Sequence, residues 1–341
     1  MVASRLRDVA ELAGVSIRTV SNVVNGYVPV SDAKRERVEA AVAALGYRPN
    51  VAARNLKIGR SGLIALVVPE LDVPYFSELA RFIVTFGRDL GFTVVVDQTD
   101  GDTDREKELL TRDGRAAMFD GIILSPLALS HADLDQREAI APLVLLGERI
   151  AGGNNDHVTI DNVAAAQEAT EHLIDLGRQR IAAIGDQPYE TGETAQLRTR
   201  GYELAHAARG RAVDPSLIIP THRFHFSDGS EAMTALLERP GQRPDAVFCY
   251  NDLLAIGAIR TLLAAGLRVP EDVAVVGFDD IEAGRYHTPS LTTISPDKPE
   301  IARLALDRLV ARLGEHAEGP VEELRVPHQL IVRESTVGRP L

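Results

Sequence analysis

The chain has 341 residues, of which 45% are hydrophobic and 25% charged, which is typical of a folded globular protein with two domains or slightly more. The longest hydrophobic runs, such as Leu63–Val68, are only six residues long, far below the roughly 18 that a membrane-spanning helix needs. No apolar segment of the signal-peptide type follows Met1, so we expect no secretory signal. The single cysteine, Cys249, excludes a disulfide framework and a zinc site built of several thiolates, and it is typical of a reducing cytoplasm.

Charge is unevenly distributed along the chain. The whole sequence has a net charge of −12, which by itself argues against binding to nucleic acid. Residues 1–60, however, carry ten Lys or Arg against five Asp or Glu, so they have a net charge of +5 and residues 61–341 have one of −17. This asymmetry is expected when only the first segment contacts phosphate groups.

The basic segment is predicted to form three short helices. Apolar residues recur at helical spacing over Leu6–Ala13, and Gly14 then supplies the backbone freedom of a tight turn. Ser16 is a good N-cap for a second helix that ends near Asn25. Ser31 is predicted to cap a third helix that ends at Gly46 and turns Val38, Ala41, Val42 and Leu45 toward a small core. Two short helices joined by a glycine turn, with a third behind them, indicate a helix-turn-helix.

The alternative is an ordinary helical bundle with a polar surface. The second predicted helix presents short Ser, Thr and Asn side chains, whereas a solvated helix face favours Glu and Lys, which form helix better. Base edges and phosphate oxygens are groups that such short hydrogen-bonding side chains can contact. The pattern therefore favours DNA recognition.

The sequence closely resembles the lactose/galactose-repressor (LacI/GalR) family of bacterial transcription regulators. The segments that carry the resemblance are RDVAELAGVSIRTVSNVVNG, from Arg7, and VSDAKRERVEAAVAALGYRPNVAARNLKIGRSGLIALVVP, from Val30. The match is nearly continuous over residues 7–69, and the family's pattern recurs to the C-terminus.

The resemblance assigns roles in DNA recognition to seven residues of the second helix and its cap. Those in base-reading positions are Ile17, Arg18 and Asn22, and those in phosphate-contacting positions are Ser16, Thr19, Ser21 and Asn25. Arg18 can bridge guanine O6 and N7, and Ile17 offers apolar contact to a thymine methyl. Most family members carry Arg where this chain has Asn22, and because asparagine prefers adenine, we expect the operator to differ there.

A short segment with helix-forming residues follows the basic segment. Val51–Lys57 is too short to stay helical alone, since isolated helices below about 12 residues are marginal in water. A plain linker is the alternative. The resemblance implies instead a hinge that folds only on DNA and pairs with its twin across a dimer axis, with Leu56 as an apolar wedge between base pairs. The residues expected in the minor groove are Asn50, Ala53, Leu56 and Lys57.

Residues 61–341 alternate short apolar runs with amphipathic stretches, a rhythm that predicts parallel sheets covered by helices. Predicted strands are Leu63–Val68, Thr93–Val96, Gly121–Leu124, Leu143–Leu146, Ile181–Ile184, Ala246–Cys249 and Val273–Phe278. Predicted helices include Phe76–Leu90, Ala164–Leu176, Leu253–Ala265 and Pro299–Leu313. The expected fold is thus an all-α helix-turn-helix head followed by an α/β body, which by resemblance has two lobes like a periplasmic binding protein.

The expected domains follow from these elements and the resemblance. They are a DNA-binding domain over residues 1–48, a hinge over 49–60, and an effector-binding and dimerisation domain over 61–341. Within the last, we expect an N-lobe of about 61–161 and 293–324 and a C-lobe of about 162–292 and 325–341. The chain would cross between lobes near Asp161–Ala164, Leu291–Ile294 and Glu323–Pro327.

Ligands of open α/β sheets bind at the carboxyl ends of strands, here between the lobes. The residues predicted for the effector site are Tyr75, Phe76, Ser125, Arg198, Phe224, Asn251 and Asp279. By resemblance, Arg198, Asn251 and Asp279 form hydrogen bonds to the effector, and the aromatic residues wall the site. Such a set suits a sugar, although the family's usual Asp after the fourth strand is Gly147 here, followed by Glu148.

Several of these residues could instead have an ordinary structural role. Asp252, next to Asn251, could be a helix N-cap, since an Asp that follows a strand often is. Phe76 could be a core residue, and Arg198 could form a surface ion pair. His222, His225 and Asp228 could form a metal site, but they lack the spacing that metal ligands usually show.

Three classes of function differ in what they require of the sequence. A dimeric repressor with a palindromic operator and a small-molecule effector, expected to be a sugar, fits both parts of the chain and would act in the cytoplasm on the nucleoid. A solute-binding protein for sugar uptake shares the body but requires export. An enzyme is disfavoured, because no nucleotide-binding, P-loop, zinc-protease or serine-hydrolase motif occurs. We expect no catalytic residues, cofactor or metal, and the absence of C-terminal heptads predicts a dimer rather than a tetramer.

Overall fold

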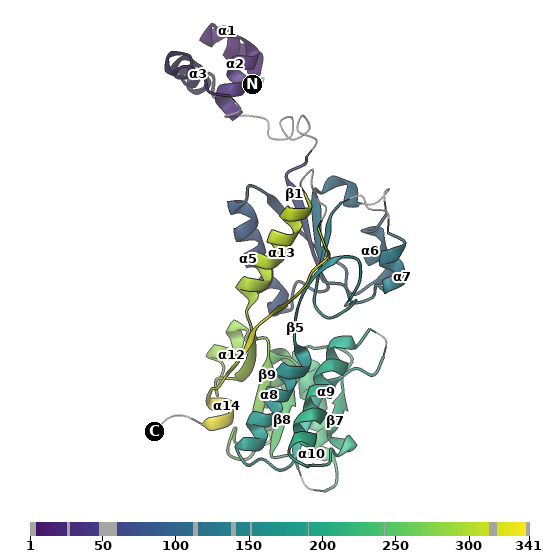
Figure 1. The fold of residues 1–341 in the computed structure, drawn as a ribbon. Helices are drawn as coiled ribbons and strands as arrows, with labels where there is room; N and C mark the ends of the chain where they lie inside the picture. The colour runs from purple at the N-terminus through teal and green to yellow at the C-terminus, as the bar shows by residue number, and fades with distance from the viewer. Residues whose placement is uncertain are drawn as a thin grey trace. The chain divides into compact units, whose positions relative to one another are not determined.

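A computed structural model describes residues 5–25, 28–47, 60–111, 115–137, 141–150, 152–189, 191–241, 243–313 and 319–338 (Figure 1). The chain divides into two compact units, Met1–Ser61 and Gly62–Leu341. The predicted hinge residues Asn50, Ala53, Leu56 and Lys57 lie outside the described residues, and so does the side chain of Asn25. None of the described helices is long and apolar enough to cross a membrane.

The first unit contains the three predicted helices, α1 (Leu6–Ala13), α2 (Ile17–Asn25) and α3 (Asp32–Leu45). Their shared core is apolar, and its fully buried members include Val9, Val20 and Val38, one from each helix. This packing explains the helical spacing of the apolar residues, because each helix turns one stripe toward the other two.

The turn between α1 and α2 depends on Gly14 and on an arginine from α3. Gly14 has a φ of 60°, in the left-handed region that favours glycine. Nη2 of Arg37 donates hydrogen bonds to the carbonyl oxygens of Ala13 (2.5 Å) and Gly14 (2.9 Å), at the helix end where carbonyl groups lack partners within the helix. The amide of Thr19 donates to the hydroxyl of Ser16 at 3.1 Å, so Ser16 caps α2 as predicted.

The second unit begins with a six-stranded parallel sheet. Its strands are β1 (Leu63–Val68), β2 (Thr93–Gln98), β3 (Gly121–Leu124), β4 (Leu143–Leu146), β5 (Asp156–Ile160) and β11 (Glu323–Val326), in the spatial order β11-β5-β4-β3-β1-β2. One face is covered by α5 (Pro74–Asp89) and α13 (Lys298–Arg312), and Figure 1 shows α6 (Thr103–Glu108) and α7 (His131–Asp135) on the other. Because the sheet is covered on both faces, its central strands are apolar without alternation.

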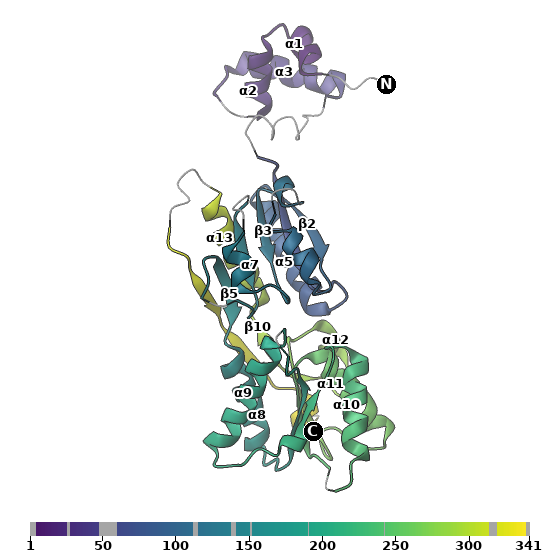
Figure 2. The same cartoon turned by 90° about the vertical axis from the view of Figure 1, so that its right-hand side faces the viewer.

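A second six-stranded sheet follows. Its strands are β6 (Ile181–Asp186), β7 (Ile218–Pro220), β8 (Ala246–Cys249), β9 (Ala274–Phe278), β10 (Thr292–Pro296) and β12 (His328–Ile331), in the order β12-β10-β9-β8-β6-β7. All neighbours are parallel except β10 and β12. Figure 2 shows α8 (Asn162–Asp175) and α9 (Glu193–Ala208) on one side of the strands and α10 (Phe226–Glu238) and α11 (Asp252–Ala264) on the other. Two short helices also accompany this sheet: α12 (Glu282–Tyr286) follows β9, and α14 (Glu334–Val337) follows β12.

We call the first sheet with α5, α6, α7 and α13 the first lobe, and the second sheet with α8 to α12 and α14 the second lobe. The chain crosses between them after β5, after β10 and after β11. The middle crossing, expected near Leu291–Ile294, instead follows Pro296, because β10 pairs with β9 and β12 in the second sheet. Residues 293–296 therefore belong to the second lobe and not to the first.

Candidate functional site

The predicted recognition face of the first unit lies on α2 and its cap. Ile17 is 50% exposed, and Ser16 and Arg18 are also exposed, whereas Val20 is fully buried in the opposite direction. Arg18 is the charged residue of this helix, which has no acidic residue in its first turn. A cation among short polar side chains suits a surface that meets phosphate oxygens and base edges.

Not every residue assigned to DNA is equally accessible. Thr19, Ser21 and Asn22 are half-buried, and the hydroxyls of Ser16 and Thr19 lie 2.9 Å apart. Ser16 is therefore both a helix cap and a candidate phosphate contact. These roles are compatible, since a hydroxyl has one donor and two acceptor sites.

In the second unit, contacts between the lobes concentrate where strand ends meet. Glu148 follows β4 of the first lobe, and its carboxylate accepts hydrogen bonds from Nδ2 of Asn162 (2.5 Å) and the hydroxyl of Thr194 (2.8 Å) in the second lobe. Nearby in the fold, Nε2 of His225 lies 3.0 Å from a carboxylate oxygen of Glu70, which follows β1. The carboxyl ends of the two sheets thus meet at the boundary between the lobes, where the effector site is expected, and we call this boundary the predicted effector cleft.

Arg198 lies within this cleft and not at the surface. Its side chain is buried, its Nε donates to Oδ1 of Asn162 at 2.8 Å, and its Nη1 donates to the carbonyl of Tyr250. The guanidinium also lies 3.6 Å from the centroid of the Phe278 ring, close enough for a cation–π contact. The alternative interpretation of Arg198 as a surface ion pair is therefore wrong.

Asp279 is a buried carboxyl directly after β9, with a φ of 107° that is uncommon outside glycine. Burial raises its pKa from 3.8 to about 6, although the charges of Arg198 and Lys298 lower it. Burial also raises the pKa of the Tyr75 hydroxyl, and the negative charges of Glu148 and Asp279 raise it further. Tyr75, Glu148, Arg198 and Asp279 are therefore close enough to interact electrostatically.

The other predicted aromatic residues have structural contacts. The rings of Tyr75 and Phe76 pack edge to face, with centroids 5.3 Å apart. Phe76 also packs against an apolar cluster that contains Val73 of the first lobe and Leu253 and Ile281 of the second. Phe76 therefore packs as a core residue, as the alternative interpretation predicted. If it also contacts an effector, it does so in addition to this packing.

Asn251 caps α11, since its Oδ1 accepts the amide of Leu254 at 2.8 Å and its Nδ2 donates to the carbonyl of Phe224 at 3.0 Å. The capping interpretation of Asp252 is wrong, because its buried carboxyl instead accepts from the amide of Ile281 and the hydroxyl of Thr293. The structure thus brings Asn251 and Phe224 together through a hydrogen bond that fixes the loop before α10.

Sequence reasoning missed Glu148 and Asn162 as members of the site. Gly147, with a φ of 88°, stands where the family usually has Asp, but the next residue supplies a carboxylate at the same strand end. The position of Glu148 shortly after a buried apolar strand is the sequence feature that could have identified it. Ser125 is buried at the end of β3, and its hydroxyl lies 3.7 Å from where a Cβ of Gly147 would be.

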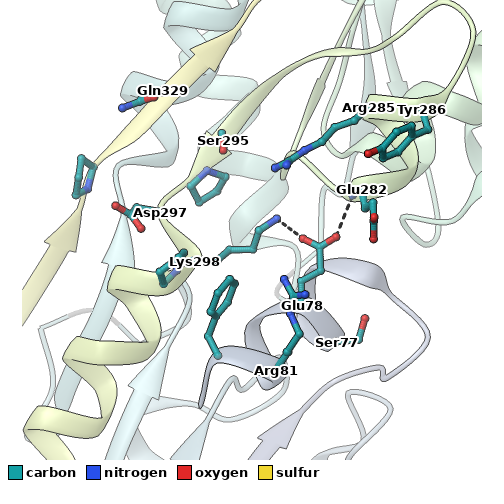
Figure 3. A pocket seen from close by; sticks show the side chains of 14 residues that line it. Ser77, Glu78, Arg81, Glu282, Arg285, Tyr286, Ser295, Asp297, Lys298 and Gln329 are labelled. Atoms are coloured by element: carbon teal, nitrogen blue, oxygen red, sulfur yellow. Dashed lines mark hydrogen bonds and ion pairs between the residues drawn. The ribbon is translucent and has the colours of Figure 1, made fainter. Parts of the chain in front are cut away.

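A cavity of about 600 Å³ lies between α5, α12 and the start of α13 (Figure 3). None of the seven residues predicted for the effector lines it. At its wall, Nζ of Lys298 lies 2.7 Å from a carboxylate oxygen of Glu78. Among the described residues, no group of three or more His, Cys, Asp or Glu is placed to hold a metal ion, and this includes His222, His225 and Asp228.

The cleft combines carboxylates, a guanidinium and aromatic rings between two lobes. Carboxylates and guanidinium groups are acceptors and donors for hydroxyl groups, and aromatic faces pack against C–H surfaces. The arrangement can recognise a small polyhydroxylated molecule.

Comparison with known families matches both units. Residues 5–50 match the family model described as bacterial regulatory proteins, lacI family, and residues 170–336 match a periplasmic binding protein-like domain. The ribose operon repressor of Escherichia coli strain K12 is 36% identical over 313 residues, which cover 90% of this chain and 92% of that protein.

Solved structures of LacI proteins are also similar to this chain. A lac repressor dimer bound to operator and the anti-inducer ONPF has a TM-score of 0.85 and 29% identity, and it covers 98% of this chain and all of that one. A LacI family transcriptional regulator from Enterococcus faecium with bound ribose has a TM-score of 0.71 and 28% identity, with coverage of 82% and 100%.

Proposed function

The chain belongs to the LacI family of bacterial regulatory proteins, and we propose that it is a repressor whose affinity for an operator is controlled by a small molecule bound between the lobes. The observation that carries this function is the cross-lobe network of Glu148, Asn162 and Arg198. A ligand that changes those contacts changes the relation between the lobes. The same chain carries an exposed recognition helix for DNA.

In this proposal α2 reads the operator. Arg18 pairs with a guanine, Ile17 packs on a thymine methyl and Asn22 prefers an adenine, because these side chains match the edges of those bases. Ser16, Thr19, Ser21 and Asn25 contact phosphates and fix the register of the helix in the major groove. Ser16, Ile17 and Arg18 are exposed and Thr19, Ser21 and Asn22 are half-exposed, which supports contact with DNA.

The protein acts as a homodimer on a palindromic operator, because two copies of one recognition helix read two symmetric half-sites. The related lac repressor is described as a dimer bound to operator. The hinge residues Asn50, Ala53, Leu56 and Lys57 enter the minor groove at the centre of the site, where Leu56 unstacks a base step. Since operator DNA is its ligand, we place the protein in the cytoplasm on the nucleoid.

The effector is a sugar, for which D-ribose is the first probe. The relative from Escherichia coli is named a ribose operon repressor, and the Enterococcus faecium regulator was solved with bound ribose. In this chain Arg198, Asp279 and Glu148 supply donors and acceptors for hydroxyl groups, and Tyr75, Phe76 and Phe224 supply rings. Ser125 and Asn251 complete the set at the ends of β3 and β8.

Effector and operator are coupled through the lobes. Binding in the cleft alters the contacts between the lobes, which shifts the first lobes of the two subunits and orders or disorders the hinges. Coupling energies of about 1–3 kcal/mol are usual for such systems and change affinity by roughly 5–150-fold.

The decisive experiment selects operator sequences from random DNA with the full-length protein, then measures operator binding by gel shift at fixed salt with D-ribose and a panel of other sugars. A palindromic selected site whose binding responds to one sugar is the expected result. Absence of any selected sequence argues against a DNA-binding regulator. A selected site that responds to no sugar argues only against the sugar effector.

A further inference from the structure

The segment that carries the cleft carboxylate is held by a residue outside the predicted site. Asp279 and Asp280 both have positive φ values, 107° and 48°, which are uncommon for residues other than glycine. Nζ of Lys298 donates to both of their carbonyl oxygens, at 2.5 and 3.2 Å. The Lys298 side chain is 7% exposed, so its ammonium is fixed among these acceptors.

Glu78 of α5 completes this arrangement. One carboxylate oxygen lies 2.7 Å from Nζ of Lys298, and the other accepts the amide of Glu282 at 2.9 Å. Figure 3 shows the Lys298 and Glu78 side chains pointing toward each other at the cavity wall, with Glu282 beyond. The two side chains thus hold both ends of the segment Asp279–Glu282.

These hydrogen bonds cross the boundary between the lobes. Glu78 and Lys298 belong to helices of the first lobe, and Asp279–Glu282 belongs to the second. The ammonium of Lys298 also lies 5.7 Å from the centroid of the Tyr75 ring, so it touches two elements of the effector site. Separation of the lobes would break the bonds that hold Asp279 in place.

We propose that Lys298, paired with Glu78, is a positioning residue for effector recognition, because the pair orients the Asp279 carboxyl and does so only while the lobes are together. The inference rests on the proposed function, in which Asp279 contacts the effector. A preorganised carboxyl binds a ligand more tightly than one that must first be ordered.

Several charged groups surround the Asp279 carboxyl, and each affects its titration. Arg198 of α9 and Lys298 of α13 favour the ionised form, whereas Glu148, after β4, and Glu78 of α5 disfavour it. Asp252 of α11 interacts with it electrostatically as well. Loss of the Lys298 charge therefore raises the pKa of Asp279, and loss of the Glu78 charge lowers it.

The first experiment measures D-ribose binding to the full-length protein by calorimetry in two variants, Lys298→Met and Glu78→Gln. Both should weaken binding by roughly tenfold, because both release the Asp279 segment. Loss of the Lys298 charge raises the pKa of Asp279, and loss of the Glu78 charge lowers it. Weaker binding in both variants therefore indicates positioning, because the charge of Asp279 alone would change binding in opposite directions. The matched control is Arg303→Met, which removes an exposed charge from the same helix. Affinities equal to that of the control would overturn the proposal.

A second experiment needs no effector. Urea unfolding gives the free energy of unfolding of the wild type and of Asp279→Asn at each pH. The difference between the two changes with pH, and the pH at the midpoint of that change reports the pKa of Asp279 in the folded protein. Lys298→Met should move this midpoint up by about half a pH unit or more, and Arg303→Met should leave it unchanged. If the wild type binds no D-ribose, the proposed effector is wrong, and the midpoint still tests whether Lys298 acts on the Asp279 carboxyl, on which the inference depends. An unmoved midpoint would refute it. If Lys298→Met does not fold, Glu78→Gln should move the midpoint down.

Discussion

The carboxylate of Glu148 and the side-chain amide of Asn162 meet at 2.5 Å, although one belongs to the first lobe and the other begins the first helix of the second. Asn162 in turn accepts a hydrogen bond from Arg198. A first-lobe carboxylate is thereby linked through one amide to the buried guanidinium of the effector cleft.

Replacement of Glu148 by Ala should therefore destabilise the second unit. The variant removes the acceptor for Asn162 and Thr194, and loss of such partners costs about 1–3 kcal/mol. Urea unfolding of the full-length protein measures the change. Glu231→Ala, which removes an exposed carboxylate from α10, is the control. Equal stabilities of the two variants would show that the link does not contribute.

Arg198→Ala should abolish the response to effector and leave operator binding in its absence. The guanidinium joins Asn162, Tyr250 and Phe278, so its loss removes both a contact for the ligand and part of the link between lobes. Gel shifts with and without D-ribose test this. Arg200→Ala, on the exposed side of the same helix, should retain the wild-type response. A normal response in Arg198→Ala would place the effector elsewhere.

Stability should depend on pH through Asp279. Its pKa is about 6 in the folded protein and near 3.8 in the unfolded chain, so the folded state holds this proton more strongly. The corresponding stability is fully present below about pH 4 and is lost as the pH rises through 6. Asp279→Asn removes this dependence. Relative to wild type, the variant should gain about 3 kcal/mol between pH 4 and pH 8, since one pKa unit corresponds to about 1.4 kcal/mol. A constant difference in urea unfolding across this range contradicts the prediction.

Arg18→Ala should relax the base preference in each half-site. A bidentate contact to guanine contributes about 1–3 kcal/mol of discrimination, and its removal makes that position tolerant of other bases. Selection from random DNA reveals the change. Arg7→Ala, on α1 and paired with Glu11, should leave the selected sequence unaltered. An unchanged preference in Arg18→Ala would remove that residue from the base-reading set.

Leu56→Ala should weaken specific binding much more than non-specific binding. The proposed wedge acts only where the central step of the operator deforms, so random DNA gains little from it. Competition assays with operator and random duplex at the same salt concentration compare the two. Leu176→Ala, an exposed leucine of the second lobe, is the control. Equal losses on both kinds of DNA contradict a hinge that reads deformability.

Much of the architecture was predictable from local patterns. The runs Leu63–Val68, Gly121–Leu124 and Ala246–Cys249 were predicted as strands with their observed bounds, because each is a short apolar run whose neighbours are turn-forming. The helix-turn-helix was predictable for a similar reason, since Gly14 and Ser16 mark a turn and a cap within a few residues of each other. β10 was assigned to the wrong lobe, because pairing with β9 and β12 is a long-range choice that its own residues do not encode.

The sequence by itself determined which residues stand at strand ends and which helix is predicted to face DNA, because apolar spacing and caps act over a few residues. Only the tertiary structure decided that Arg198 is buried, that Asn251 and not Asp252 caps α11, and that Glu148 and Lys298 serve the cleft. These roles depend on partners more than a hundred residues away for Glu78 and Lys298, or across a lobe boundary for Glu148. Charge and hydrogen-bond capacity are properties of a residue, but their use depends on what the fold brings within about 3 Å.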